Sequence, residues 1–210
     1  MKKIIVALDN MTYASMMKLA GLLKDKVWGF KVNDALLHYG ARIIYDLKDV
    51  SRSNVMADPK LFDIPNTVKN SIRVLNSYGV DIVTVHALAG ADVLKAAKDA
   101  AQDKTKIFAI TVLTSDNDEN RDYEVRKRCY IAQSAKVDGI VCAASDLEKI
   151  KDIDLLKIVP GIRPSGSVKG EDQVHTSSII PPLADYVVVG RAIVDSNDPV
   201  SVVEKLQQGN

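Results

Sequence analysis

The sequence predicts an α/β fold, a single (β/α)8 TIM barrel, because strand-like and helix-like segments alternate along its 210 residues. Short apolar runs rich in β-branched residues predict the strands, and most are separated by segments with helical spacing of apolar residues. The runs are apolar throughout, which is typical of parallel strands covered on both faces. Eight runs favour a closed barrel over the runner-up, an open doubly wound sheet. They are residues 4–8, 27–32, 54–57, 82–85, 107–112, 139–143, 156–159 and 186–189.

The connections between these runs predict the helices. Apolar residues recur three and four positions apart, as on one face of a helix, within residues 16–23, 36–47, 68–75 and 93–101. Two later connections are weaker. Residues 145–154 hold little more than two helical turns, and residues 177–184 are interrupted by Pro181-Pro182. We therefore expect the barrel to be compact and irregular between its last three strands.

Composition narrows the class of protein. The formal net charge of +1 gives no electrostatic footprint for nucleic acid, and no apolar run is long enough to cross a membrane. No linker divides the chain, so residues 1–210 are expected to form one domain, the single (β/α)8 barrel. Cys129 and Cys142 have no metal-binding or redox spacing, which indicates reduced packing residues in a cytoplasmic protein.

The third strand leads into an unusual run of charges at Asp58, Lys60 and Asp63. If the strand continues through this run, Asp58 and Lys60 point to the same face, about 6.5–7 Å apart along the chain. Pro59 favours an extended Asp58 but cannot donate to a strand ladder, so regular pairing should end here. Asp63 then falls in a turn, and Pro65 suits the first turn of the next helix. The alternative is a solvated charge cluster at a strand end.

In a barrel of this kind the functional residues lie where the strands end. Asp9 and Lys31 end the first two strands, so with Asp58 and Lys60 they give an Asp/Lys/Asp/Lys set that can converge at one mouth. His86 ends the fourth strand, and we expect it to be a structural, hydrogen-bonded histidine.

The last two strands indicate a phosphate site. Glycines that let backbone N–H groups approach a ligand occur beside arginines, in Pro160-Gly161-Ile162-Arg163-Pro164 and in Gly190-Arg191. The alternative for the second of these is a plain turn with a solvated arginine. The polar, glycine-hinged loop between the two strands, residues 165–173, is interpreted as a flap over the ligand.

These residues closely resemble a known family. The stretch Asp58-Pro59-Lys60-Leu61-Phe62-Asp63-Ile64-Pro65-Asn66-Thr67 is similar to the signature of the orotidine 5′-monophosphate decarboxylases. The resemblance extends in order through Ala7-Leu8-Asp9, Lys31, Asp138-Gly139-Ile140-Val141-Cys142, Pro160-Gly161-Ile162-Arg163-Pro164 and Val189-Gly190-Arg191. It implies a cofactor-free and metal-free enzyme that converts orotidine 5′-monophosphate to UMP, the last step of de novo pyrimidine nucleotide synthesis. It also implies a homodimer with active sites at the subunit interface.

The resemblance also implies roles for individual residues. Lys60 matches the lysine that protonates carbon 6, and Asp58 matches the carboxylate that faces the substrate's own carboxylate. Lys31 and Asp9 match the pair that completes the charge network and touches the ribose. Asp63 and Thr67 match residues offered to the partner's site, and Ser115 matches the contact with the pyrimidine. The residues that match the family's phosphate site are Pro160, Gly161, Arg163, Gly190, Arg191 and Gln173 or a neighbour. The last position is given in this form because the segment that follows it, residues 174–184, is shorter than the family's usual helix.

Two rival functions remain open. A magnesium-dependent sugar-phosphate decarboxylase of the same superfamily shares the Asp-x-Lys-x-x-Asp pattern, but its relatives lack an equivalent of Ile64-Pro65-Asn66-Thr67. A non-catalytic barrel that binds a nucleotide is the second rival, from a different class. It has little reason to bury an unbroken series of charges.

Overall fold

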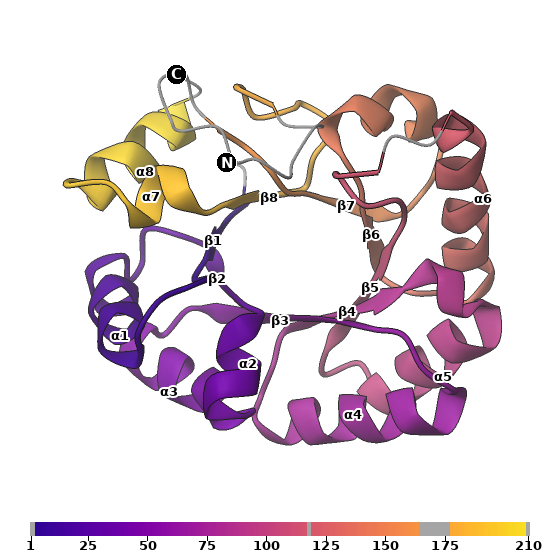
Figure 1. The fold of residues 1–210 in the computed structure, drawn as a ribbon, viewed down its shortest axis with the longest axis horizontal. Coiled ribbons are helices and arrows are strands. Elements are labelled where there is room, and N and C mark those ends of the chain that lie inside the picture. The colour runs from indigo at the N-terminus through magenta and orange to yellow at the C-terminus, as the bar shows by residue number, and fades with distance from the viewer. Residues whose placement is uncertain (1–2, 117–118, 164–176, 209–210) are drawn as a thin grey trace.

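The computed structural model describes residues 3–116, 119–163 and 177–208. Within them eight parallel strands close into a barrel, each paired with the next and the last paired with the first (Figure 1). The predicted closed barrel is therefore confirmed, and the open sheet is wrong. The strands are β1 (Lys3–Ala7), β2 (Gly29–Val32), β3 (Asn54–Leu61), β4 (Ile82–His86), β5 (Lys106–Ile110), β6 (Gly139–Val141), β7 (Leu156–Val159) and β8 (Tyr186–Val189).

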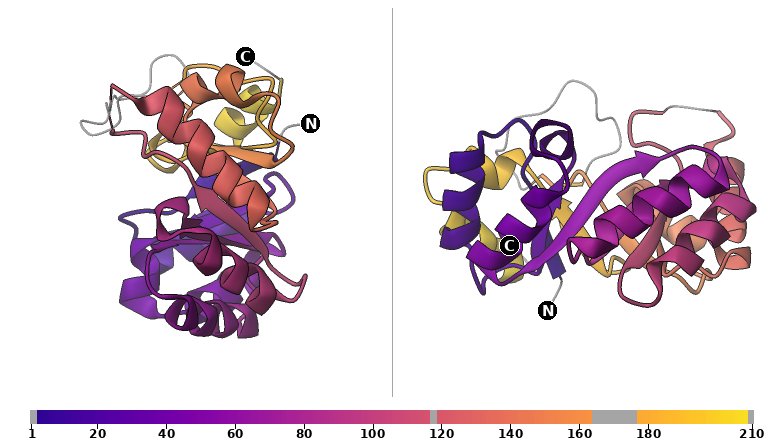
Figure 2. Two further views of the ribbon diagram at one scale, coloured as in Figure 1. Left: turned by 90° about the vertical axis from the view of Figure 1, so that its right-hand side faces the viewer. Right: turned by 90° about the horizontal axis from the view of Figure 1, so that it is seen from below.

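Helices surround the barrel, and α1 packs on α3 while α4 packs on α5 (Figure 1, Figure 2). As predicted, the connection after β6 is short and holds only a 3-10 helix, and the described residues 177–185 before β8 contain no helix. No helix in the described ranges is long and apolar enough to cross a membrane. The helices are α1 (Tyr13–Leu22), α2 (Asp34–Tyr39), α3 (Arg42–Ser51), α4 (Pro65–Ser77), η1 (Ala87–Ala89), α5 (Ala91–Ala101), α6 (Arg121–Ser134), η2 (Ala144–Ile150), α7 (Arg191–Val194) and α8 (Pro199–Gln208).

Strand β3 carries an irregularity beside its charges. It pairs regularly with β4 up to Ala57 and resumes only at Leu61, opposite Val85. Between them Lys60 adopts a left-handed conformation with φ of 49°, which costs a non-glycine residue about 1–3 kcal/mol. Pro59 has no N–H for the ladder, which explains why regular pairing ends where the sequence predicts. The strand nevertheless continues past the predicted end, and Pro65 begins α4 as expected.

The barrel interior is apolar in its lower part, near the N-terminal ends of the strands. The ring of Tyr186 lies edge-on to those of Trp28 and Phe108, with centroids 5.0 and 5.9 Å away. A Cβ atom at Gly139 would lie 2.3 Å from the Phe108 ring, so the packing of these aromatic rings requires glycine there. The same buried cluster includes Ile5, Ala7, Met56, Ile82, Ile158 and Val188. This packing gives the polar end of the barrel a solid floor.

An aspartate directly precedes each of the strands β4, β6 and β8. The backbone N–H of each aspartate donates to a carbonyl of the preceding strand, and its carboxylate accepts the N–H of the same residue. Each carboxylate bond is 2.8 Å long, and the pairs are Asp81 with Val55, Asp138 with Ile107 and Asp185 with Lys157. These clamps satisfy strand N–H groups at the end of the barrel opposite the charges.

Candidate active site

A cavity of about 520 Å³ opens at the carboxyl ends of the strands. Its floor includes Met56, Ile158 and Val188 of the barrel interior, together with Ile110 at the end of β5. Its charged lining comes from five strands or the loops that follow them, and consists of Asp9, Lys31, Asp58, Lys60, Arg163 and Arg191. The strand ends expected to converge do so at one mouth.

Four of these side chains form a chain of alternating charge. The Lys31 Nζ lies 2.9 Å from Asp9 Oδ1 and 3.4 Å from Asp58 Oδ2. The Lys60 Nζ donates to the same Asp58 oxygen at 2.7 Å. The two inner members are buried, with 7% of both Lys31 and Asp58 exposed, while the Lys60 side chain is 37% exposed. The arrangement places one ammonium group at the open end of a buried network, where it can reach a ligand.

Thr84 completes this network, and sequence reasoning missed it. Its buried hydroxyl donates to Asp58 Oδ1 at 2.7 Å and accepts the Lys60 backbone N–H at 3.1 Å. Both oxygens of Asp58 therefore have partners, as a buried carboxylate requires. The sequence could have indicated Thr84 through the alternation of side chains along a strand, because every second residue of β4 faces the barrel interior.

The other end of the cavity is basic and rich in backbone. Pro160, Gly161 and Gly190 line it together with Arg163 and Arg191. Partial burial and the positive charge of Arg191 lower the pKa of Arg163. An anion bound near the Arg163 guanidinium group would favour its charged form. This end of the cavity suits a phosphate.

Several predicted site residues lie elsewhere. Ser115 is exposed and outside the cavity lining, which its neighbours Leu113 and Thr114 join, and its contact with a pyrimidine stays a prediction. Asp63 and Thr67 are also exposed and outside the lining, and the Asp63 carboxylate accepts the N–H of Ile64 at 2.6 Å. Gln173 and the flap at residues 165–173 fall outside the described residues.

His86 does not show the expected hydrogen bond at Nδ1, which is buried without a partner among the described residues. Its ring instead lies edge-on to that of Phe62, with centroids 6.0 Å apart. Burial, followed by the charges of Arg128 and Lys60, lowers the pKa of His86 from its usual 6.5. The imidazole is therefore neutral at pH 7.

Fold and cavity define a (β/α)8-barrel enzyme with a lysine–aspartate network at one end of its cavity and two arginines at the other. The chain belongs to the Orotidine 5'-phosphate decarboxylase / HUMPS family, whose model matches residues 2–206.

Curated relatives agree with this assignment. The chain is 37% identical over 184 residues to the orotidine 5'-phosphate decarboxylase of Streptococcus sanguinis, covering 80% of each chain. It is 36% identical over 191 residues to the enzyme of the same name from Lactococcus lactis subsp. cremoris, again covering 80% of each.

Solved structures share the fold across nearly the whole chain. The orotidine 5'-phosphate decarboxylase of Lactobacillus acidophilus superposes with a TM-score of 0.81 at 28% identity, covering 99% of this chain and 98% of the other. The orotidine 5'-monophosphate decarboxylase of Methanocaldococcus jannaschii, complexed with the inhibitor BMP, gives a TM-score of 0.79 at 30% identity, with the same coverage.

Proposed function

We propose that this protein decarboxylates orotidine 5′-monophosphate to UMP without a cofactor, in the last step of de novo pyrimidine nucleotide synthesis. The observation that carries the proposal is the Asp9–Lys31–Asp58–Lys60 chain at one end of a cavity whose other end is lined by two arginines. Family membership alone does not identify the reaction, because the family includes both orotidine 5'-phosphate decarboxylases and the HUMPS group. The named relatives and the Ile64-Pro65-Asn66-Thr67 sequence favour this one.

Lys60 is the proposed proton donor. Loss of carbon dioxide leaves a carbanion at carbon 6, with no adjacent carbonyl to accept the charge. Stabilisation must therefore come from fixed positive charge aimed at that carbon. Lys60 supplies this charge from the open end of the network and then donates its proton to carbon 6. Its hydrogen bond to Asp58 holds the ammonium group in place.

Asp58 has two proposed tasks. It orients Lys60, and it faces the carboxylate of the bound substrate, where like charges repel until carbon dioxide leaves. Lys31 and Asp9 extend the network towards the ribose. Because Asp58 accepts hydrogen bonds on both oxygens, its position is set before the substrate binds.

The phosphate end contributes binding energy far from the reacting carbon. Contacts from Arg163, Arg191 and the neighbouring backbone hold the phosphate, with Gln173 or a neighbour in the flap as a further ligand. Such remote binding stabilises a closed, organised site and lowers the barrier at carbon 6 indirectly.

The magnesium-dependent rival makes a different demand on Asp58. A metal ion at this carboxylate would compete with the Lys60 ammonium group and the Thr84 hydroxyl for its oxygens. The test is turnover of orotidine 5′-monophosphate by purified protein in EDTA, followed as loss of pyrimidine absorbance. We expect full activity in EDTA. Turnover that requires added magnesium would support the rival, and no turnover under either condition would refute the proposed substrate.

We also propose a homodimer in which Asp63 and Thr67 reach the partner's cavity. Both are exposed and outside their own cavity, Asp63 between β3 and α4 and Thr67 in the first turn of α4. Their neighbours Phe62 and Ile64 are each 65% exposed, an unusual fraction for large apolar side chains at a strand end. A partner subunit on this segment would bury them.

We further propose a cytoplasmic location. The buried cysteines Cys129 and Cys142 form no disulfide, which is typical of a reducing compartment.

A further inference from the structure

The loop after β5 forms one wall of the cavity. Val112, Leu113 and Thr114 line the cavity there, between the end of β5 and the start of α6. A nucleotide whose phosphate lies at Arg163 and whose reacting carbon faces Lys60 extends its ring across the mouth. The loop after β5 then meets the ring from the side.

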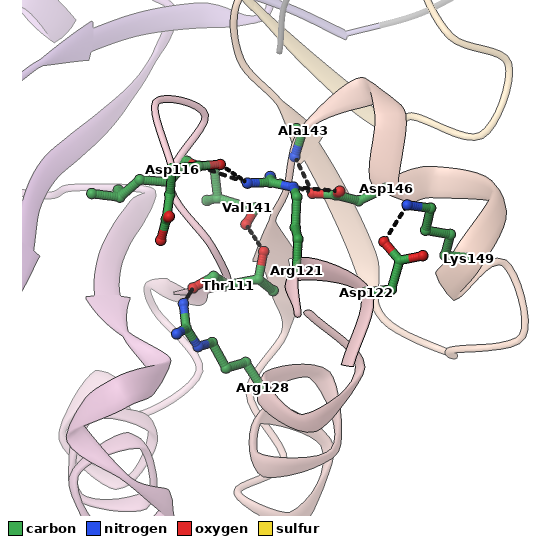
Figure 3. Close-up of polar contacts among 10 residues, drawn as sticks. Thr111, Asp116, Arg121, Asp122, Arg128, Val141, Ala143, Asp146 and Lys149 are labelled. Carbon is green, nitrogen blue, oxygen red and sulfur yellow. Dashed lines mark hydrogen bonds and ion pairs between the residues drawn. The ribbon is translucent and has the colours of Figure 1, made fainter. Parts of the chain in front are cut away.

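Arg121 holds this loop from behind. As the first residue of α6, it turns its guanidinium group back under the loop (Figure 3). Its Nη1 donates to the carbonyl oxygens of Leu113 at 3.0 Å and Asp116 at 2.8 Å. Only 6% of Arg121 is exposed. The path of the wall is therefore fixed through backbone carbonyls by one rigid, planar group.

The same guanidinium is anchored by a carboxylate on the next connection. Its Nε and Nη2 donate to the two oxygens of Asp146, in η2, at 2.9 and 2.8 Å. Asp146 is fully buried and also accepts the backbone N–H of Ala143 at 3.2 Å (Figure 3). Ala143 follows Cys142, which lines the cavity. The pair thus joins two neighbouring parts of the cavity wall.

A second arginine of α6 supports the base of the loop. The Arg128 Nη1 donates to the Thr111 carbonyl at 2.6 Å, and the Thr111 hydroxyl donates to the Val141 carbonyl at 2.9 Å (Figure 3). Two arginines of α6 therefore donate hydrogen bonds to three backbone carbonyls of the loop, those of Thr111, Leu113 and Asp116. Its other arginine, Arg126, pairs with Asp152 at the surface, where the Asp152 side chain is 56% exposed.

Stability alone does not explain a buried ion pair at this place. Desolvation of two charges offsets their attraction, and well-packed apolar residues of similar volume are often as stable or more so. An apolar pair, however, offers no donors to the carbonyls of Leu113 and Asp116. What the ion pair adds is a fixed position for the loop.

We propose that Arg121 and Asp146 are positioning residues that hold the wall formed by Leu113 and Thr114 against the base of the bound nucleotide. This inference rests on the proposed function, since it takes a pyrimidine nucleotide as the ligand. The pair touches no substrate atom. It acts on recognition of the base and not on the phosphate, which is held on the other side of the cavity.

The test compares two ligands that share the ribose 5-phosphate part, only one of which carries a base. Dissociation constants of UMP and of ribose 5-phosphate are measured by calorimetry for the wild type and for the double variant Arg121→Met/Asp146→Leu. Replacing both charges avoids leaving one charge buried and unpaired. The matched control is Arg126→Met, which removes an arginine–aspartate pair from the surface of the same helix. Arg121→Lys, which keeps the charge but not the planar fork, is the second variant.

We expect the double variant to bind UMP about 10- to 100-fold more weakly, because a displaced wall loses contacts with the base. Its affinity for ribose 5-phosphate should stay near that of the wild type, and Arg121→Lys should fall between the two. The Arg126→Met control should bind both ligands normally. Unchanged UMP binding, or an equal loss for both ligands, would overturn the inference. If the double variant does not fold, the same ligand comparison with Arg121→Lys decides. Failure of the wild type to turn over orotidine 5′-monophosphate would instead refute the proposed function.

Discussion

Thr84 links the two residues on which the proposed chemistry depends. One hydroxyl group sets the orientation of the Asp58 carboxylate and accepts the N–H of Lys60, whose backbone is left-handed. Thr84 is fully buried, so water cannot easily replace its hydroxyl group in these contacts. A sequence gives little sign of this, because a threonine in an apolar strand is usually a packing residue.

Thr84→Val removes the hydroxyl at nearly constant shape. Asp58 then lacks one partner and Lys60 loses a backbone tether, so we expect kcat to fall about 10- to 100-fold through misplacement of the ammonium group. KM should change much less. Thr84→Ser, which restores the hydroxyl, should recover most of the activity. Steady-state kinetics on both variants decide, and a valine variant with wild-type kcat would show that the hydroxyl does not position the site.

His86 gives a prediction about pH. Its pKa lies below 6.5 in the folded protein, chiefly because of burial, whereas in the unfolded chain it returns to about 6.5. As pH falls below about 6.5 the unfolded state therefore binds more protons, and stability decreases until the pH reaches the folded-state pKa. Denaturant unfolding at several pH values should show a steeper loss for the wild type than for His86→Gln. Equal slopes, or a His86 pKa above 6.5 by NMR, would contradict this.

At the scale of elements, the two ends of the barrel have different tasks. The carboxyl ends of the strands carry the cavity, and the amino ends carry the repeated aspartate clamps at Asp81, Asp138 and Asp185. Asp138 also pairs with Lys98 of α5 at 2.8 Å. Clamps at this end hold neighbouring strands together and lie far from the proposed chemistry.

Asp138→Ala should therefore lower stability and leave catalysis intact. The Ile107 N–H loses its partner, which costs about 1–3 kcal/mol for a buried donor. Asp138→Asn keeps an acceptor for that N–H while weakening the pair with Lys98, so its loss should be smaller. Urea unfolding and steady-state kinetics are measured side by side. A large fall in kcat without a fall in stability would show that the clamp acts on the site.

At the scale of the whole molecule, the sequence predicted the features that depend on periodicity and strand ends. The eight strands, the short connection after β6 and the convergence of Asp9, Lys31, Asp58 and Lys60 all follow from apolar runs that end in charged residues. Contacts between distant positions were out of reach. Arg121 and Asp146 are 25 residues apart, and only the packing of α6 on η2 brings them together.

Local backbone geometry was the other limit. Proline explained where the regular pairing of β3 ends, but not that the strand resumes at Leu61 with Lys60 in a left-handed conformation. Likewise, the sequence does not indicate that Leu113 and Thr114 line the cavity while Ser115 lies outside the lining. Loop geometry after a strand depends on contacts such as those of Arg121, which the local sequence does not encode.

The proposed dimer predicts complementation between inactive subunits. Lys60→Ala removes the proton donor from its own site, and Asp63→Ala removes the group offered to the partner's site. In a mixed dimer, one site contains both mutations and the other contains neither. Mixing the two proteins should therefore restore activity, up to about half of the wild-type value per dimer. No recovery, despite subunit exchange demonstrated by mass spectrometry, would argue against shared sites.

The central claim is that Lys60 protonates carbon 6 of orotidine 5′-monophosphate as carbon dioxide leaves. The most direct measurement is turnover in D2O containing EDTA by the wild type and by Lys60→Ala, with the product analysed by mass spectrometry and NMR. We expect the wild type to form UMP that carries deuterium at carbon 6, and the folded variant to form almost none. A variant that produces deuterated UMP at a rate comparable to that of the wild type would contradict the assignment of Lys60.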